Sequence, residues 1–99
     1  LCEILEAFLE ETPRQLDAIK QGLMKSDAAL LRRAAHTIKG AVRYFGANQA
    51  FDLALRLETL GQNGELSQAA AVAEELQREL ARITPLFQAR LGAKEPAVT

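Results

Sequence analysis

Apolar residues recur at intervals of three and four along most of the chain, which is the spacing of amphipathic helices. The first such run, over residues 1–9, predicts a short helix. The segment Thr12-Pro13-Arg14-Gln15 predicts a new helix start, because threonine can cap, proline fits the first helical position and glutamine completes a capping box. We expect this second helix to end near Met24.

A third helix is predicted to begin at the caps Ser26 and Asp27 and to run to about Phe45, where Gly46 ends it. A fourth is predicted over residues 48–60, where apolar positions again follow the helical period. Both helices are amphipathic, so each requires neighbours to cover its apolar face.

The Gly-rich segment 61–64 predicts a turn, and Ser67 is a suitable cap for the last helix. Beyond that helix, residues 92–99 are expected to form a flexible C-terminal tail. The apolar positions of the last helix alternate three and four apart, as in a heptad seam: Leu66, Ala69, Ala73, Leu76, Leu80, Ile83 and Phe87.

Length and composition fit one helical domain. The chain has 99 residues, of which 48% are hydrophobic and 25% charged, the balance of a globular protein rather than a disordered one. Short loops between long amphipathic helices favour antiparallel packing. We therefore expect an all-α fold over residues 1–91, an up-and-down antiparallel four-helix bundle with a short extra N-terminal helix.

Several classes of protein are excluded by the residues present. No apolar stretch approaches the roughly 18 residues that a membrane span requires, and the N-terminus lacks the layout of a secretory signal. Cys2 is the only cysteine, so no internal disulfide can form. One cysteine and one histidine cannot supply the usual four-ligand zinc site. We expect a module of a longer protein, since the chain begins at Leu1 rather than at a methionine. We also expect it to be cytoplasmic and to bind no metal of its own.

Charge is unevenly distributed although the formal net charge is only -1. Residues 28–51 contain no aspartate or glutamate, yet they contain Arg32, Arg33, Lys39 and Arg43. The 27–45 helix is therefore locally basic in an otherwise acidic protein.

His36, the only histidine, is predicted to face away from the apolar stripe of this basic helix. Gly40 follows one turn later on the same outer strip, where a mid-helix glycine costs about 1 kcal/mol relative to alanine. Nothing inside the domain explains a glycine on an exposed face, whereas clearance for another protein to reach His36 does. The predicted core face comprises Leu31, Ala34, Ala35, Ile38, Ala41, Val42 and Phe45.

These surroundings suit a transient phosphoryl carrier. Imidazole titrates near neutral pH, and nearby positive charge favours its neutral, nucleophilic form. Lys39 and Arg43 could stabilise the oxygens of a phosphoryl group on the ring, and phosphoryl transfer depends mostly on positioning and charge stabilisation. The alternative is a solvated surface histidine without a role.

The same stretch resembles the histidine-containing phosphotransfer (HPt) domain of bacterial two-component phosphorelays. The resemblance rests on His36-x-x-Lys39-Gly40 followed by Phe45-Gly46, and on the preceding Arg32-Arg33-Ala34-Ala35. The opening Phe8-Leu9-Glu10-Glu11-Thr12-Pro13, and Leu57-Glu58 with the following turn and Leu66, extend it over roughly residues 1–91.

The resemblance implies a four-helix bundle in which His36 is the phosphoacceptor, modified on its outward ring nitrogen. It implies that Lys39 assists the phosphoryl group electrostatically and that Gly40 leaves room for the partner. Glu58 matches a position that often holds glutamine or glutamate near the imidazole, where it could accept the ring N–H; an ordinary solvated residue is the other interpretation.

The resemblance also implies the partners. His36 would receive a phosphoryl group from the aspartate of one response-regulator receiver domain and pass it to another, with Arg32, Arg43 and Glu58 as candidate partner-binding residues. Tyr44 either joins that surface or simply covers the bundle. Such a monomeric carrier has no nucleotide site, binds neither nucleic acid nor membrane, and needs no cofactor except the Mg²⁺ that the receiver supplies.

Three alternatives remain at this point. The first is that the chain is the phosphoacceptor domain of a chemotaxis-type kinase, because such a domain has the same motif as a module of a hybrid sensor histidine kinase. A non-catalytic interaction module would use the heptad seam for dimerisation, although a bundle core requires such a seam anyway. Nucleic-acid binding through the basic helix is disfavoured, because the chain is net acidic and lacks interleaved aromatic residues.

Overall fold

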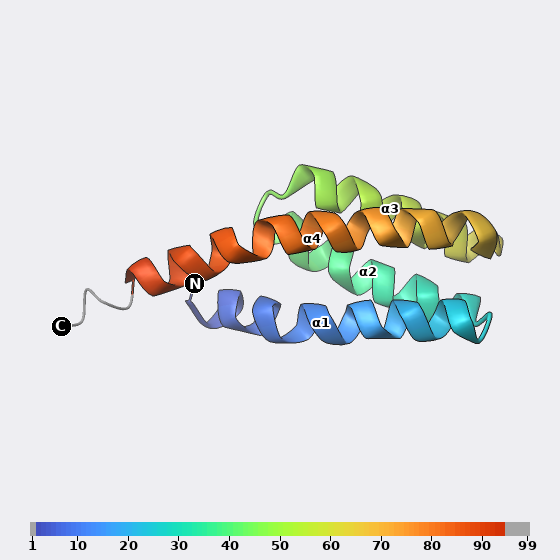
Figure 1. Ribbon diagram of the computed structural model, residues 1–99, viewed down its shortest axis with the longest axis horizontal. Helices are drawn as coiled ribbons and strands as arrows, with labels where there is room; N and C mark the ends of the chain where they lie inside the picture. Colours follow the sequence, from blue (N-terminus) through green and yellow to red (C-terminus); the bar gives the residue numbers. More distant parts are fainter. Residues whose placement is uncertain (1, 95–99) are drawn as a thin grey trace.

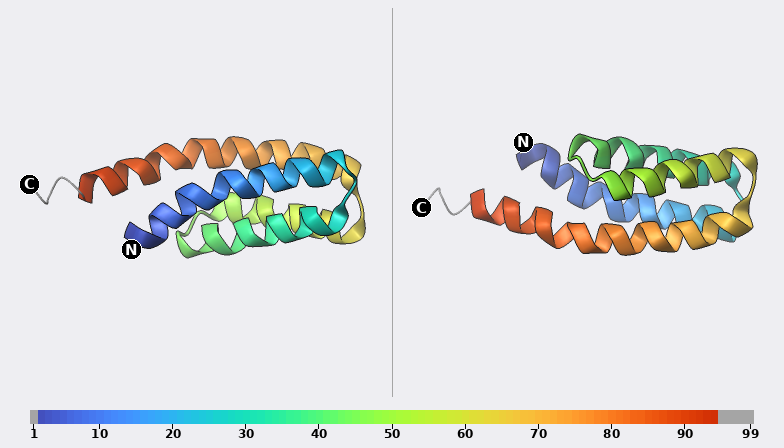
Figure 2. Two further views of the ribbon diagram at one scale, coloured as in Figure 1. Left: turned by 90° about the horizontal axis from the view of Figure 1, so that it is seen from below. Right: turned by 90° about the horizontal axis from the view of Figure 1, so that it is seen from above.

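The computed structural model describes residues 2–94, which form four α-helices joined by short turns (Figure 1). The helices are α1 (Cys2–Met24), α2 (Ala28–Tyr44), α3 (Asn48–Asn63) and α4 (Leu66–Lys94). Successive helices run in opposite directions, and the views in Figure 2 show them side by side as a single bundle. The all-α, up-and-down four-helix architecture is thus confirmed.

The prediction of a separate short N-terminal helix is wrong, because α1 is continuous through Pro13. Proline inside a helix costs about 3 kcal/mol or more, mainly by removing one backbone hydrogen bond and crowding the preceding turn. Burying each large apolar side chain contributes roughly 1.5–3 kcal/mol, and several of them flank the proline. Burial therefore outweighs the break along one unbroken stripe: Leu5, Phe8, Thr12, Leu16, Ile19 and Leu23.

Thr12 accordingly lies within the core face, 7% exposed, rather than capping a second helix. The expected capping box is also absent, since the Gln15 amide donates to Glu11 Oε2 at 2.9 Å within the same helix.

The turns that end the middle helices confirm the expected signals in part. Asp27 caps α2 as predicted, with its Oδ1 accepting from the Leu30 backbone N–H at 3.1 Å. Gly46 follows α2 with a positive φ of 70°. The second turn comes later than expected, because Gly61 lies inside α3 and Gly64, at φ 74°, ends that helix.

The last helix is longer than the sequence pattern indicates. It begins at Leu66 and continues to Lys94, so residues 92–94 of the expected tail are helical. The remainder of that tail, residues 95–99, lies outside the described residues. No helix within residues 2–94 has the length and apolar character needed to cross a membrane.

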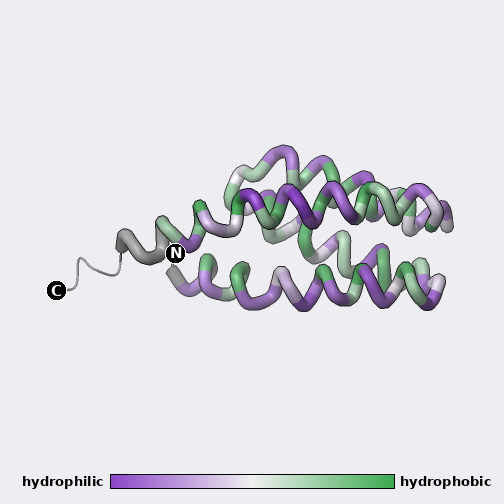
Figure 3. The backbone as a smooth tube through the Cα atoms, viewed as in Figure 1, coloured by the Kyte–Doolittle hydropathy of each residue, from purple (hydrophilic) through white to green (hydrophobic). Residues whose placement is uncertain are grey.

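The core runs along the bundle axis and includes the heptad seam of α4. Figure 3 shows apolar residues recurring at intervals along each helix. Of the predicted seam positions, Ala69, Leu76, Leu80 and Ile83 are buried in this core, while Leu66, Ala73 and Phe87 are half-buried against it. Val72, outside the predicted seam, is also buried. At one end, Phe8, Phe45 and Phe87 form a cluster with ring centroids 5.1–5.2 Å apart. The seam is therefore explained by the bundle itself, without a second chain.

Gly22 marks a close approach between the end of α1 and the start of α2, and it supplies a stability test. A Cβ at this position would lie 3.0 Å from Leu31 N and 3.1 Å from Asp27 O, both backbone atoms. We expect Gly22→Ala to lower the free energy of unfolding by about 1–3 kcal/mol, as overpacking does. Gly40→Ala is the matched control and should raise it by up to about 1 kcal/mol. Urea denaturation measures both, and an unchanged Gly22→Ala midpoint would contradict the close approach.

Candidate functional site

His36 lies near the middle of α2 with its side chain 65% exposed, as the helical period predicts. The opposite face of α2 is buried in the core through Leu31, Ala34, Ala35, Ile38 and Val42. Ala41 and Phe45, also expected in the core, are half-buried. The outward orientation of the imidazole is thus a consequence of the apolar stripe behind it.

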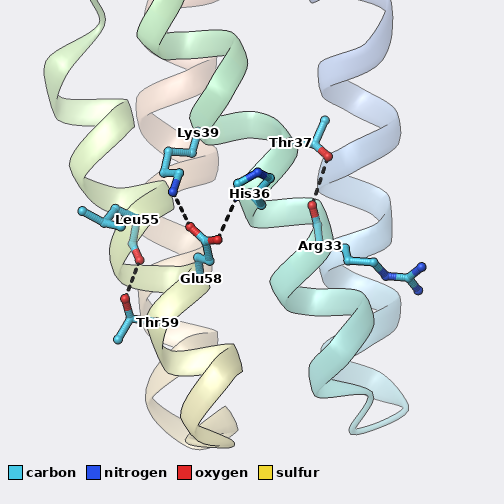
Figure 4. Close-up of polar contacts among 7 residues, drawn as sticks. All are labelled: Arg33, His36, Thr37, Lys39, Leu55, Glu58 and Thr59. Atoms are coloured by element: carbon cyan, nitrogen blue, oxygen red, sulfur yellow. Dashed lines mark hydrogen bonds and ion pairs between the residues drawn. The ribbon is translucent and has the colours of Figure 1, made fainter.

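Glu58 of α3 contacts the imidazole directly. Its Oε2 atom lies 2.8 Å from His36 Nδ1, and its Oε1 atom lies 2.7 Å from Lys39 Nζ (Figure 4). The sequence allows two interpretations of Glu58, this contact or an ordinary solvated residue, and the structure favours the contact. Three side chains from two helices therefore form one polar cluster.

A close approach of the α2 and α3 backbones brings this cluster together. Gly61, one turn beyond Glu58, would place a Cβ 3.3 Å from Arg32 N and 3.4 Å from Ala28 O. Arg32 in turn lies one turn before His36. Because the two backbones nearly touch beside the site, Glu58 can reach an imidazole on the neighbouring helix.

Glu58 is held as a carboxylate. The ammonium of Lys39 lowers the pKa of Glu58 below its ordinary value of 4.5, and His36 acts in the same direction, while partial burial opposes them. The Lys39 ammonium and the Glu58 carboxylate form an ion pair. At neutral pH Glu58 can therefore only accept hydrogen bonds.

The charge on Glu58 assigns the tautomer of His36. Since a carboxylate only accepts, Nδ1 must carry the hydrogen and donate it to Oε2 across 2.8 Å. A neutral imidazole then has its lone pair on Nε2. With a side chain 65% exposed, the arrangement offers a nucleophilic nitrogen to an approaching group.

Gly40 lies beside this site in open space. Apart from its two chain neighbours and the nearby backbone of α2 itself, no atom of the described residues comes within 4 Å of the position that a Cβ would occupy, and the residue is exposed. The outer strip through His36 and Gly40 is therefore unobstructed by the domain itself, as predicted.

The remaining predicted residues are not part of the cluster. Arg32 and Arg43 are exposed on α2 and form no ion pair with any side chain that the structure describes. The hydroxyls near the site are turned toward their own helices: Thr37 donates to the Arg33 carbonyl and Thr59 to the Leu55 carbonyl, both at 3.0 Å (Figure 4).

The sequence does not predict the pocket that lies between α1 and α2. It has a volume of about 340 Å³ and a largely apolar lining of Ala7, Phe8, Glu11, Ala41, Tyr44 and Phe45. Tyr44 is 59% exposed, and its ring meets Phe45 edge-on at 5.2 Å. Tyr44 thus borders the pocket two turns beyond His36. The sequence signal that could have indicated this pocket is Tyr44, an exposed aromatic residue that follows small residues on one face of α2.

The fold and the site define a class of protein, helical bundles that present one histidine with a free ring nitrogen on an outer helix face. The Hpt domain family model matches residues 3–84, and the chain belongs to this family. The crystal structure of histidine-containing phosphotransfer protein B from Pseudomonas aeruginosa PAO1 is similar, with 29% sequence identity and a TM-score of 0.88. The match covers 93% of this chain and 80% of that chain. Comparison with curated protein sequences gives no match.

Membership in the family establishes the general activity. Hpt domains are phosphoryl carriers in phosphorelays, they interact with response-regulator receiver domains, and they have no nucleotide site of their own. The chain is accordingly a histidine phosphotransfer domain.

Proposed function

We propose that His36 carries the phosphoryl group and that Nε2 is the nitrogen that forms the bond. The observation that supports this most is the hydrogen bond between His36 Nδ1 and the Glu58 carboxylate, which leaves Nε2 with the lone pair. The exposure of the imidazole and the open space at Gly40 support the approach of a partner from outside.

In the proposed reaction the Nε2 lone pair attacks the phosphorus of an aspartyl phosphate on a receiver domain. The N–P bond forms as the P–O bond to the aspartate breaks, and the bonding electrons remain on the aspartate carboxylate. Catalysis at such a centre consists mainly of positioning and electrostatic stabilisation. Gly40 leaves room for the receiver, and Arg32 and Arg43 are positioned to meet its acidic active site.

The proposal extends to the setting of the reaction. One receiver supplies the phosphoryl group and another accepts it, each bringing its own Mg²⁺, and the carrier acts as a monomer in the cytoplasm. We propose a hybrid sensor histidine kinase as the parent protein, with a chemotaxis-type kinase as the alternative. The domains encoded beside this segment distinguish the two.

Phosphotransfer from a receiver domain tests the proposal. A panel of receiver domains is phosphorylated with radiolabelled acetyl phosphate, freed of donor, and mixed with this chain and Mg²⁺. We expect label on the chain that is labile to acid and stable to base, and peptide mapping should place it on His36. Acid-stable label, label on another residue, or no label from any receiver contradicts the proposal.

A further inference from the structure

Lys39 is engaged with Glu58 and is not free beside the imidazole. Its Nζ atom lies 2.7 Å from Glu58 Oε1, and its side chain is only 22% exposed. Figure 4 shows Lys39 and His36 reaching the same carboxylate from α2, each toward a different oxygen atom. A lysine held in this way differs from one extended into solvent to meet an incoming phosphoryl group.

Glu58 depends on this lysine. Its Oε1 atom is shielded from solvent, and no hydrogen bond from the described residues reaches it. The charged or titratable groups that act on Glu58 are Lys39 and His36, both on α2. A desolvated carboxylate oxygen is costly without a compensating charge, and burial alone raises the pKa of Glu58. Without Lys39, Glu58 therefore takes up a proton more readily.

The protonation of Glu58 matters in both directions of transfer. When Nε2 bonds to phosphorus, the proton stays on Nδ1 and the ring becomes an imidazolium, whose positive charge faces the Glu58 carboxylate. In the reverse step the N–P bond breaks, its electron pair returns to Nε2, and the leaving group is a neutral imidazole because Nδ1 has kept its proton. A protonated Glu58 would no longer favour the Nδ1–H tautomer and would not offset the imidazolium charge.

We propose that Lys39 is a positioning residue that promotes phosphoryl transfer through Glu58, by keeping this carboxylate in place as the acceptor of the His36 Nδ1 hydrogen, and not by contacting the phosphoryl group. The inference rests on the proposed role of His36, and it revises the role that the family resemblance implies for Lys39.

A double-mutant cycle separates the two roles of Lys39. In Glu58→Gln the side-chain amide oxygen is neutral, so it can accept the Nδ1 hydrogen without an ammonium beside it. We expect Lys39→Met to slow transfer on the order of 10-fold when Glu58 is present, the lower end of the loss seen when a group that orients a metal-bound imidazole is replaced. In the Glu58→Gln background the same substitution should change the rate by less than about twofold. An equal loss in both backgrounds indicates direct contact with the phosphoryl group and overturns the inference.

Two measurements on the unphosphorylated protein complete the test. Carboxyl-carbon NMR should show a higher pKa for Glu58 in Lys39→Met than in the wild type. Nitrogen NMR of the ring, at a pH where imidazole is neutral, should show mainly Nδ1–H in the wild type. Lys20→Met, which removes an exposed lysine on α1, is the matched control and should change neither.

These outcomes distinguish the inference from the proposed function. If Lys39→Met leaves the pKa of Glu58 unchanged, the inference is wrong although His36 can still be the phosphoacceptor. If no label reaches His36, the proposed function fails while the NMR measurements still report whether Lys39 keeps Glu58 ionised.

Discussion

Replacing His36 by glutamine is expected to abolish phosphoryl acceptance completely. Glutamine has similar size and can still donate an amide hydrogen toward Glu58, but its amide nitrogen has no available lone pair for attack on phosphorus. The Glu58–Lys39 ion pair does not require the imidazole. The loss should therefore be chemical, with label from every receiver falling to background and the thermal midpoint close to that of the wild type.

Thr37→Ala is the matched control for this substitution. Thr37 is the exposed neighbour of His36 on α2, and its hydroxyl is bonded to the Arg33 carbonyl rather than to the cluster. We expect the control to accept label at the wild-type rate. Persistent acid-labile label on the His36→Gln variant would show that another residue is the acceptor.

The exposure of His36 could be predicted because it depends on one helix alone. Five residues of α2 that the period assigns to the core are buried, so the angle of His36 on that helix follows directly. The contact with Glu58 could not be derived in this way. It depends on how α3 is rotated about its axis and how closely it approaches α2, and both depend on packing between residues far apart in the sequence.

Pro13 and Gly61 show why the helix boundaries were less predictable. Each residue is a strong local signal for a break, and each lies inside a helix in the structure. At Pro13 the buried stripe continues on both sides, so tertiary burial outweighs the lost hydrogen bond. At Gly61 the absent side chain allows close packing against Arg32, so the glycine supports the α2–α3 contact instead of ending α3.

Gly40 differs from Gly22 and Gly61 because no part of the domain packs against it. A Cβ at either of those two positions would meet the backbone of α2 within 3.3 Å, whereas at Gly40 it would meet no described atom within 4 Å apart from its chain neighbours and its own helix backbone. A side chain added at Gly40 therefore changes the outer surface without changing the packing of the helices within the bundle. This separates effects on docking from effects on the fold.

Gly40→Gln is expected to impair phosphoryl transfer while keeping or raising stability. The new side chain would project from the strip that contains His36, where a receiver must bring its aspartate within bonding distance of Nε2. Displacing reacting atoms by about 1 Å can cost on the order of 100-fold in rate, and we expect a loss of that size. Replacing a mid-helix glycine should stabilise α2 by up to about 1 kcal/mol. Rapid-quench transfer kinetics and urea denaturation measure the two effects.

The opposite signs of these effects make the experiment decisive about Gly40. Ala71→Gln places the same side chain on the exposed surface of α4 and should leave transfer unchanged. If the Gly40→Gln protein transfers slowly but keeps its stability, the substitution affects the encounter with the receiver rather than the fold. Measuring the rate at saturating receiver concentration then separates weaker docking from misaligned reacting atoms. Unimpaired transfer would show that the partner does not need the space beside His36, and clearance would no longer account for a glycine on the exposed face of α2.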